Sequence, residues 1–213
     1  MIAVITGASG LVGKSLLQKL FQESGVTQVV SVSRRSLGVQ DPKLKEVLVA
    51  DFADLPSHQK ELQGDLYFCC LGTTIKTAGS QENFRKVDYQ AVVDFGKIAK
   101  ANNAKSFVLI SAAGAKKDSA IFYNQVKGET EDALRALKLN SLSIFRPGFL
   151  LGHRQEVRRG EQMVGAVLKL VSPVLSENIQ KTMATDVDGL AVHMLQAGKI
   201  ASPGITVIES KNI

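Results

Sequence analysis

A glycine-spaced turn at the start of this 213-residue chain constrains its fold more than any other feature. Residues 2–5 are apolar, three glycines follow at intervals of three, and residues 10–24 repeat apolar side chains at helical spacing. A strand, a tight turn and a helix N-terminus in this order form a phosphate site from backbone N–H groups. The sequence therefore predicts a dinucleotide loop, the alternative being an ordinary strand-to-helix turn. The residues expected to contact the cofactor here are Gly7, Ser9, Gly10, Leu11, Val12 and Gly13.

Strand-like and helix-like segments alternate along the rest of the chain, which is typical of a parallel sheet with right-handed crossovers. The expected strands are residues 2–6, 29–33, 46–50, 65–71, 106–111, 141–145 and 205–209. The expected helices are residues 10–24, 58–62, 82–102, 119–137, 161–171 and 186–197. We predict an α/β fold, a doubly wound parallel sheet (Rossmann fold), in one domain over residues 1–213. Residues 149–213 would form a small C-terminal extension on the substrate side.

Composition narrows the function classes. The net charge of +6 is moderate and comes without a long basic run, so we expect a phosphorylated cofactor and no nucleic-acid partner. No apolar run nears the roughly 20 residues of a membrane span, and no signal peptide is seen, which favours the cytoplasm. The adjacent Cys69 and Cys70 are poorly placed to bond each other, and the histidines are scattered (His58, His153 and His193), so no metal is expected.

In such sheets ligands bind beyond the carboxyl ends of the strands. After residues 29–33 stand Arg34 and Arg35, where a cofactor with a free ribose 2′-hydroxyl would usually meet an Asp or Glu. A guanidinium binds a 2′-phosphate that a carboxylate would repel, so the sequence favours NADP(H) over NAD(H). One of the two arginines is expected to be only a solvated surface residue.

Two further strand ends are cofactor candidates. Asp51 and Phe52 would meet the adenine, although a surface Asp at a helix start explains Asp51 equally well. Residues 71–74 would pass the ribose and phosphates, and the polar residues 75–82 after them suggest a mobile loop over the site. The cofactor candidates in this second segment are Leu71, Gly72, Thr73 and Thr74.

Ser111, Tyr123 and Lys127 are the catalytic candidates. Tyr123 and Lys127 are four apart on an expected helix and so share a face. An ammonium near a phenol favours the phenolate and lowers its pKa, so Tyr123 can exchange a proton with a carbonyl or alcohol. Ser111, at the end of the preceding strand, would hydrogen-bond the same oxygen. The alternative for the helical pair is an ordinary surface contact.

These motifs together resemble the short-chain dehydrogenases/reductases. The resemblance rests on Thr6-Gly-Ala-Ser-Gly-Leu-Val-Gly13, Ser111, Tyr123-Asn-Gln-Val-Lys127 and Arg146-Pro-Gly148. More narrowly, Cys70-Leu-Gly-Thr-Thr74, Gln125-Val-Lys-Gly-Glu129, Phe145-Arg-Pro-Gly148, Arg154-Gln-Glu156 and Gly160-Glu161 are similar to the Tat-interactive-protein-like atypical members. The resemblance covers nearly the whole chain.

The resemblance implies NADPH in the glycine loop, Tyr123 and Lys127 beside the nicotinamide ribose, and the backbone of Pro147 and Gly148 near the nicotinamide. Many relatives carry an Asn that helps a proton relay on the helix after the fourth strand, where this chain has Val87-Asp88. A carboxylate there either substitutes for the amide or impairs the relay. The short extension argues against a sugar-nucleotide epimerase, and the basic stretch 153–159 is either an anion site or a solvated loop.

Two functions follow from these residues. The first is an NADPH-dependent oxidoreductase acting on a small carbonyl or alcohol. The second is a catalytically weak NADPH-binding regulatory protein that acts through a protein partner. A monomer and a homodimer are both compatible with the sequence, which also leaves open whether residues 205–209 join the main sheet or another subunit.

Overall fold

Seven parallel strands form the central sheet of the computed structural model, which describes residues 1–151 and 184–213. The strand order is β3-β2-β1-β4-β5-β6-β9. This confirms the predicted doubly wound α/β sheet. The strands are β1 (Ile2–Thr6), β2 (Gln28–Ser33), β3 (Leu44–Leu48), β4 (Leu66–Cys69), β5 (Ser106–Ile110), β6 (Ser141–Arg146) and β9 (Gly204–Glu209).

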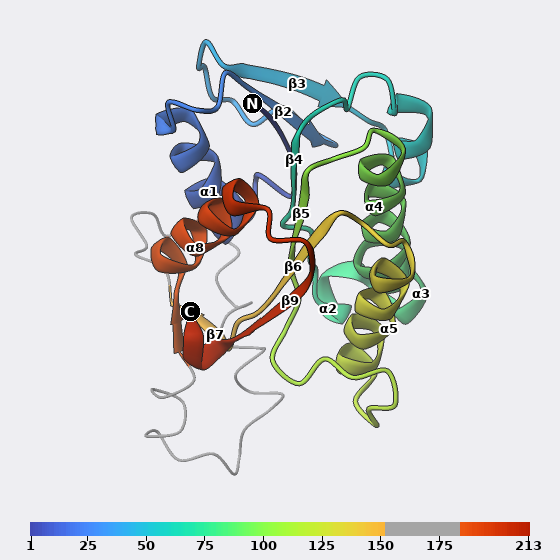
Figure 1. Cartoon of the computed structure of the whole chain (residues 1–213). Coiled ribbons are helices and arrows are strands. Elements are labelled where there is room, and N and C mark those ends of the chain that lie inside the picture. Colours follow the sequence, from blue (N-terminus) through green and yellow to red (C-terminus); the bar gives the residue numbers. More distant parts are fainter. Residues whose placement is uncertain (152–183) are drawn as a thin grey trace.

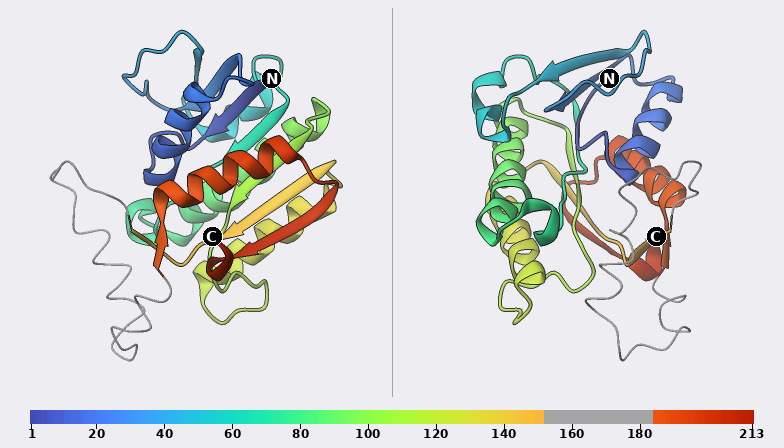
Figure 2. Two further views of the ribbon diagram at one scale, coloured as in Figure 1. Left: turned by 60° about the vertical axis from the view of Figure 1, so that its left-hand side comes forward. Right: turned by 180° about the vertical axis from the view of Figure 1, so that it is seen from behind.

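Helices cover both faces of this sheet (Figures 1 and 2). On one face α1 and α8 lie side by side, and Lys199 of α8 pairs with Glu23 at the end of α1 at 2.7 Å. On the other face lie α4 and α5. The helical elements are α1 (Leu11–Gln22), η1 (Phe52–His58), α2 (Ile75–Ala78), α3 (Gln81–Arg85), η2 (Lys86–Gln90), α4 (Ala91–Ala101), α5 (Phe122–Ala136), α8 (Val187–Ile200) and η3 (Ser210–Asn212).

The inner strands are buried on both sides. All four residues of β4 and residues 3–6 of β1 are buried, and each helical layer has its own aliphatic and aromatic core cluster against the sheet. A strand covered on both faces needs a continuous apolar run instead of alternation, which is what residues 2–5 provide. The chain reverses its direction of winding between β1 and β4, and such switch points are where these sheets bind ligands.

The expected helix 82–102 contains a wide turn. Residues 81–101 are helical, but η2 is a single π-helical stretch between α3 and α4. A regular helical repeat from the buried Phe84 would put Val87 on the inner face, whereas Val87 is half-buried and Asp88 is fully buried. The π turn adds one residue to the helical repeat and so moves the next side chain inward.

Other boundaries shift for local reasons. A 3₁₀ helix, η1, replaces the expected helix 58–62, because Asp51 caps it and Pro56 lies inside it. The expected strand 46–50 begins at Leu44 instead, since β3 pairs with β2 from Val29 onward. The segment 75–82 holds the short helix α2 and the start of α3.

The C-terminal part adds a strand to the main sheet. β9 pairs with β6 in parallel along its whole length, which settles the open question about residues 205–209. A separate two-stranded sheet, β7 (Phe149–Leu151) with β8 (Ala184–Asp186), was not predicted. The expected helix 161–171 and the basic stretch 153–159 lie outside the described residues.

Candidate functional site

The glycine turn between β1 and α1 has a geometry that suits a phosphate. Gly7 has φ +77°, and a Cβ there would lie 2.4 Å from the Cys70 backbone; a Cβ on Gly13 would lie 2.1 Å from the Gly7 carbonyl oxygen. Close backbone packing therefore requires glycine at both positions. Gly10 is exposed, and a Cβ on it would meet only the Gly7 oxygen, at 3.3 Å.

The first turn of α1 leaves its N–H groups free. Gly10 caps the helix without a side-chain bond, and the amides of Leu11, Val12 and Gly13 have no acceptor among the described residues. No acidic residue stands in this turn, while the Ser9 and Leu11 side chains are exposed. Unpaired amides at the positive end of a helix dipole fit a pyrophosphate.

The strand ends after β2 and β3 lie next to each other. The Arg34 guanidinium carbon is 5.4 Å from the centroid of the Phe52 ring, so the two predicted adenine-side segments meet. Arg34 and Arg35 are exposed, and neither forms an ion pair within the part of the chain that is described. The Asp51 carboxylate accepts from Ala53 N at 2.9 Å as a helix cap, so its contact with adenine stays a prediction.

The segment after β4 runs beside the buried pair of the site. Leu71 is buried, and Gly72 is exposed. A Cβ on Gly72 would lie 3.7 Å from both Asp88 Oδ1 and Lys127 Nζ. Thr73 N donates to Asp88 Oδ2 at 3.0 Å, and Thr74 Oγ1 caps α2 by accepting from Thr77 N.

Tyr123 and Lys127 share one face of α5, as predicted. Lys127 Nζ is 5.9 Å from the Tyr123 ring centroid, and the ring also packs on Phe84 of α3 at 5.6 Å. Lys127 is 5% exposed and Asp88 is 0% exposed, and Nζ lies 2.7 Å from Asp88 Oδ1. The sequence flagged Asp88 as a departure from the family pattern but did not predict this ion pair.

The charge of Lys127 is therefore balanced within the protein. Burial opposes its charged form, but the Asp88 carboxylate and, after it, Tyr123 favour that form more, so the pKa of Lys127 lies above its ordinary value. Nearby, burial raises the pKa of the Cys69 thiol to about 12. Lys127 thus stays an ammonium at neutral pH, and its partner is a carboxylate 2.7 Å away.

Ser111 does not meet Tyr123 in the structure. Its Oγ donates to Glu131 Oε1 at 2.6 Å, and both residues are buried. A hydroxyl has one donor hydrogen, so a Ser111 that donates to Glu131 can only accept from another group. The next residue, Ala112, carries no hydroxyl that could take the place of the Ser111 hydroxyl. A role for Ser111 at the substrate oxygen stays a prediction, and the observed geometry gives it a different partner.

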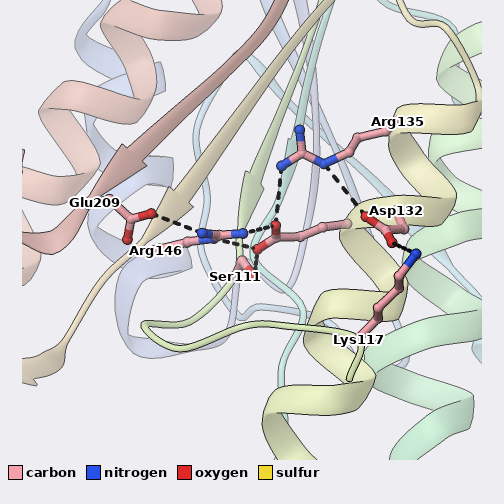
Figure 3. Close-up of polar contacts among 7 residues, drawn as sticks. Ser111, Lys117, Asp132, Arg135, Arg146 and Glu209 are labelled. Carbon is pink, nitrogen blue, oxygen red and sulfur yellow. Dashed lines mark hydrogen bonds and ion pairs between the residues drawn. The ribbon is translucent and has the colours of Figure 1, made fainter. Parts of the chain in front are cut away.

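Glu131 is the centre of a buried ionic network that sequence analysis missed. Figure 3 shows how the labelled Ser111, Arg135, Arg146 and Glu209 of this network converge from separate elements. Arg146 of β6 reaches it twice, from Nε at 3.0 Å and from Nη2 at 2.6 Å, and Arg135 reaches it at 3.5 Å. Arg146 also donates to Glu209 of β9 at 2.9 Å. Hydrogen bonding to Glu131 is the largest of the causes that raise the pKa of Arg146. The spacing 123, 127, 131 already placed Glu131 on the site-facing row of α5, although not its burial.

The backbone after β6 is held in place. The Pro147 carbonyl accepts from Ala113 N at 3.0 Å, and Gly148 N donates to Thr185 Oγ1 at 3.1 Å. The contact of this segment with the nicotinamide stays a prediction. Among the described residues, no cluster of His, Cys, Asp and Glu could hold a metal, and no helix is long and apolar enough to cross a membrane.

Most of the sequence is similar to a known protein family and to curated proteins. A family described as NAD(P)H-binding matches residues 7–167. Protein HTATIP2 of Rattus norvegicus is 42% identical over 160 residues, which are 74% of this chain and 66% of that protein. FMP52 of Debaryomyces hansenii, a protein named as mitochondrial, is 34% identical over 91% of this chain and 87% of its own length. The cytoplasmic location of this chain stays a prediction.

Solved structures share the fold. The oxidoreductase ylbE from Lactococcus lactis has a TM-score of 0.68 and 23% identity over 98% of this chain and 90% of that one. MoeE5, solved with UDP-glucose and NAD, has a TM-score of 0.73 and 17% identity over 98% of this chain and 75% of its own. At these identities the likeness concerns the fold alone. The sequence matches carry the assignment: the chain belongs to the NAD(P)H-binding family and is a homologue of the HTATIP2 and FMP52 proteins.

Proposed function

We propose that this protein is an NADPH-dependent oxidoreductase of the short-chain dehydrogenase type that acts on a small carbonyl compound. The observation that carries the proposal is the position of Lys127. Its ammonium lies next to Gly72, at the carboxyl end of β4, and β4 pairs directly with β1, whose end forms the glycine turn. The helix face that carries Tyr123 is therefore one strand away from the phosphate site.

The cofactor would be held by three groups of residues. The free amides of residues 11–13 would bind the pyrophosphate, and Arg34 and Arg35 would bind the 2′-phosphate. Lys127 and the backbone near Gly72 would flank the ribose. When bound, NADPH would supply the hydride for the reaction.

Tyr123 would supply the proton. The reduction of a carbonyl needs one proton on oxygen, and a phenol held over the strand ends can donate it. Lys127 would steady the resulting phenolate from one turn further along α5. Ser111 donates its hydrogen to Glu131 in the structure, so in this scheme it could only accept a hydrogen bond at the substrate.

The test combines binding with turnover. NADPH and NADH affinities are measured first, and turnover is then screened over a carbonyl panel with Tyr123→Phe and the matched control Tyr89→Phe. Tyr89 of η2 lies under the guanidinium of Arg85 of α3 and has no predicted role. Tyr123→Phe should lose most of the rate while keeping the cofactor, and Tyr89→Phe should keep both. Undiminished turnover in Tyr123→Phe would refute the mechanism.

A second function is favoured by a specific observation. Both groups that would assist Tyr123 are occupied by carboxylates, Ser111 by Glu131 and Lys127 by Asp88. A protein that binds NADPH without efficient chemistry fits this arrangement, and it would act through a protein partner. It predicts tight NADPH binding, no turnover on the panel, and a partner affinity that changes with NADPH. Partner binding indifferent to NADPH would contradict it.

A further inference from the structure

The π turn η2 gives Asp88 three contacts with two separate parts of the site. Its Oδ1 pairs with Lys127 at 2.7 Å, and its Oδ2 accepts from Thr73 N at 3.0 Å. Its backbone carbonyl accepts from Thr130 Oγ1 at 2.9 Å. Thr130 and Lys127 belong to α5, while Thr73 belongs to the segment after β4. The Asp88 side chain is fully buried, so these contacts lie inside the protein.

We propose that Asp88 is a positioning residue that keeps the Lys127 ammonium in a neutral pair and fixes that pair to the segment of residues 72–74. The proposal rests on the role assigned above to Lys127 beside Tyr123. The geometry has a direct electrostatic consequence. An ammonium alone acts on Tyr123 as a full charge, whereas an ammonium 2.7 Å from a carboxylate acts as a dipole, whose field falls off faster.

Within residues 1–151 and 184–213, few other charges lie near Tyr123. Its ring faces Phe84 of α3 and Lys127 of its own helix, with Asp88 behind Lys127. The Cys69 thiol on β4 is buried and neutral at ordinary pH. On the outer side of α5, Glu129 is itself paired with Arg85 of α3. Asp88 is therefore the group that decides how much positive charge Tyr123 experiences.

Asp88→Asn isolates this effect. The amide keeps an oxygen for Thr73 N and removes only the negative charge, which leaves Lys127 uncompensated. The pH at which Tyr123 ionises should then fall by about 1 unit or more, because an unpaired cation favours the phenolate. The readout is NMR titration of ¹³C-labelled tyrosine in the full chain, with Tyr123→Phe identifying one signal among the three tyrosines.

Two variants separate an electrostatic role from a structural one. In Asp88→Asn/Lys127→Met neither charge remains, so the Tyr123 midpoint should return close to that of the unmodified protein. Asp94→Asn is the matched control, since Asp94 is also a nearly buried carboxylate on this helical region and pairs with Lys97 at 2.8 Å, away from α5. It should leave the Tyr123 midpoint unchanged.

The proposal is overturned if folded Asp88→Asn titrates like the unmodified protein, or if the double variant or Asp94→Asn shows the same fall. If Asp88→Asn does not fold, Lys127→Met is compared with the double variant. There the lone Asp88 carboxylate should raise the Tyr123 midpoint relative to the double variant, and equal midpoints would overturn the proposal. The titration needs neither substrate nor turnover, so an inactive enzyme and a wrong role for Asp88 give different results.

Discussion

Replacing Glu131 by Gln should destabilise the fold more than the same change of charge at the neighbouring carboxylate Asp132 on α5. Glu131 is 1% exposed, and its carboxylate accepts from Ser111 and from the Nε and Nη2 atoms along one edge of the Arg146 guanidinium. A Gln side chain keeps one oxygen but turns an NH₂ group toward a donor, which breaks the two-point contact with Arg146. The partly buried Arg146 guanidinium on β6 then loses the nearer of its two carboxylate partners.

The size of the loss follows from what Arg146 retains. Removing one partner of a buried ion pair costs about 3–5 kcal/mol. The Arg146 side chain is 23% exposed and keeps Glu209 at 2.9 Å, so we expect about 2–4 kcal/mol. For a protein of this size that is a fall in Tm of roughly 5–15 °C.

Urea unfolding followed by circular dichroism measures this loss, with the slope of the transition checked for constancy. The matched control is Asp132→Asn, one residue along α5, where the carboxylate is 48% exposed and pairs with Lys117 at 3.4 Å. A surface pair of this kind should contribute less than about 1 kcal/mol. The reasoning fails if Glu131→Gln and Asp132→Asn cost the same, or if Glu131→Gln unfolds with the midpoint of the unmodified protein.

Three further outcomes are expected. Arg34→Ala/Arg35→Ala should weaken NADPH binding about 10- to 100-fold and leave NADH binding nearly unchanged, because the charge-assisted contact to the 2′-phosphate is lost whichever of the two arginines makes it; titration with each cofactor measures this. Gly13→Ala should weaken both cofactors by about tenfold or more in the same titration, since its Cβ would lie 2.1 Å from a carbonyl oxygen of the turn. The Lys105 ammonium and a backbone N–H of β1 hold the pKa of Asp65 below its usual value, so its stabilisation is present above about pH 4 and is lost as pH falls further. Asp65→Asn should therefore make unfolding stability, measured by urea at several pH values, less dependent on pH in that range.

The predictable parts of the site are those set by neighbours in the sequence. The glycine turn could be predicted because three glycines between an apolar strand and a helix are typical of one backbone conformation, the dinucleotide loop. The shared helix face of Tyr123 and Lys127 could be predicted because four residues make about one helical turn. The strand ends followed from the parallel order of the sheet, which periodicity alone indicates.

The partners of the site residues could not be predicted, because they come from segments distant in the sequence. Ser111 meets Glu131 twenty residues later, and Asp88 meets Lys127 across two helices. The position of Asp88 was also hidden by the π turn, because a regular repeat puts Val87 inside instead. A change of one residue in helical register cannot be read from a pattern that assumes the regular repeat.

One row of α5 links these long-range contacts to the function. Tyr123, Lys127 and Glu131 follow at intervals of four, and the two charged members are each paired inside the protein, with Asp88 and with Arg146. Burial of charge without a partner is costly, so this row can face the sheet only because those partners exist. Tyr123 is the member of the row left without such a partner among the described residues. In the proposed mechanism, the arrangement that stabilises the helix face thus leaves the phenol as the group available for proton transfer, and its proton affinity would depend on the charge that Asp88 leaves on Lys127.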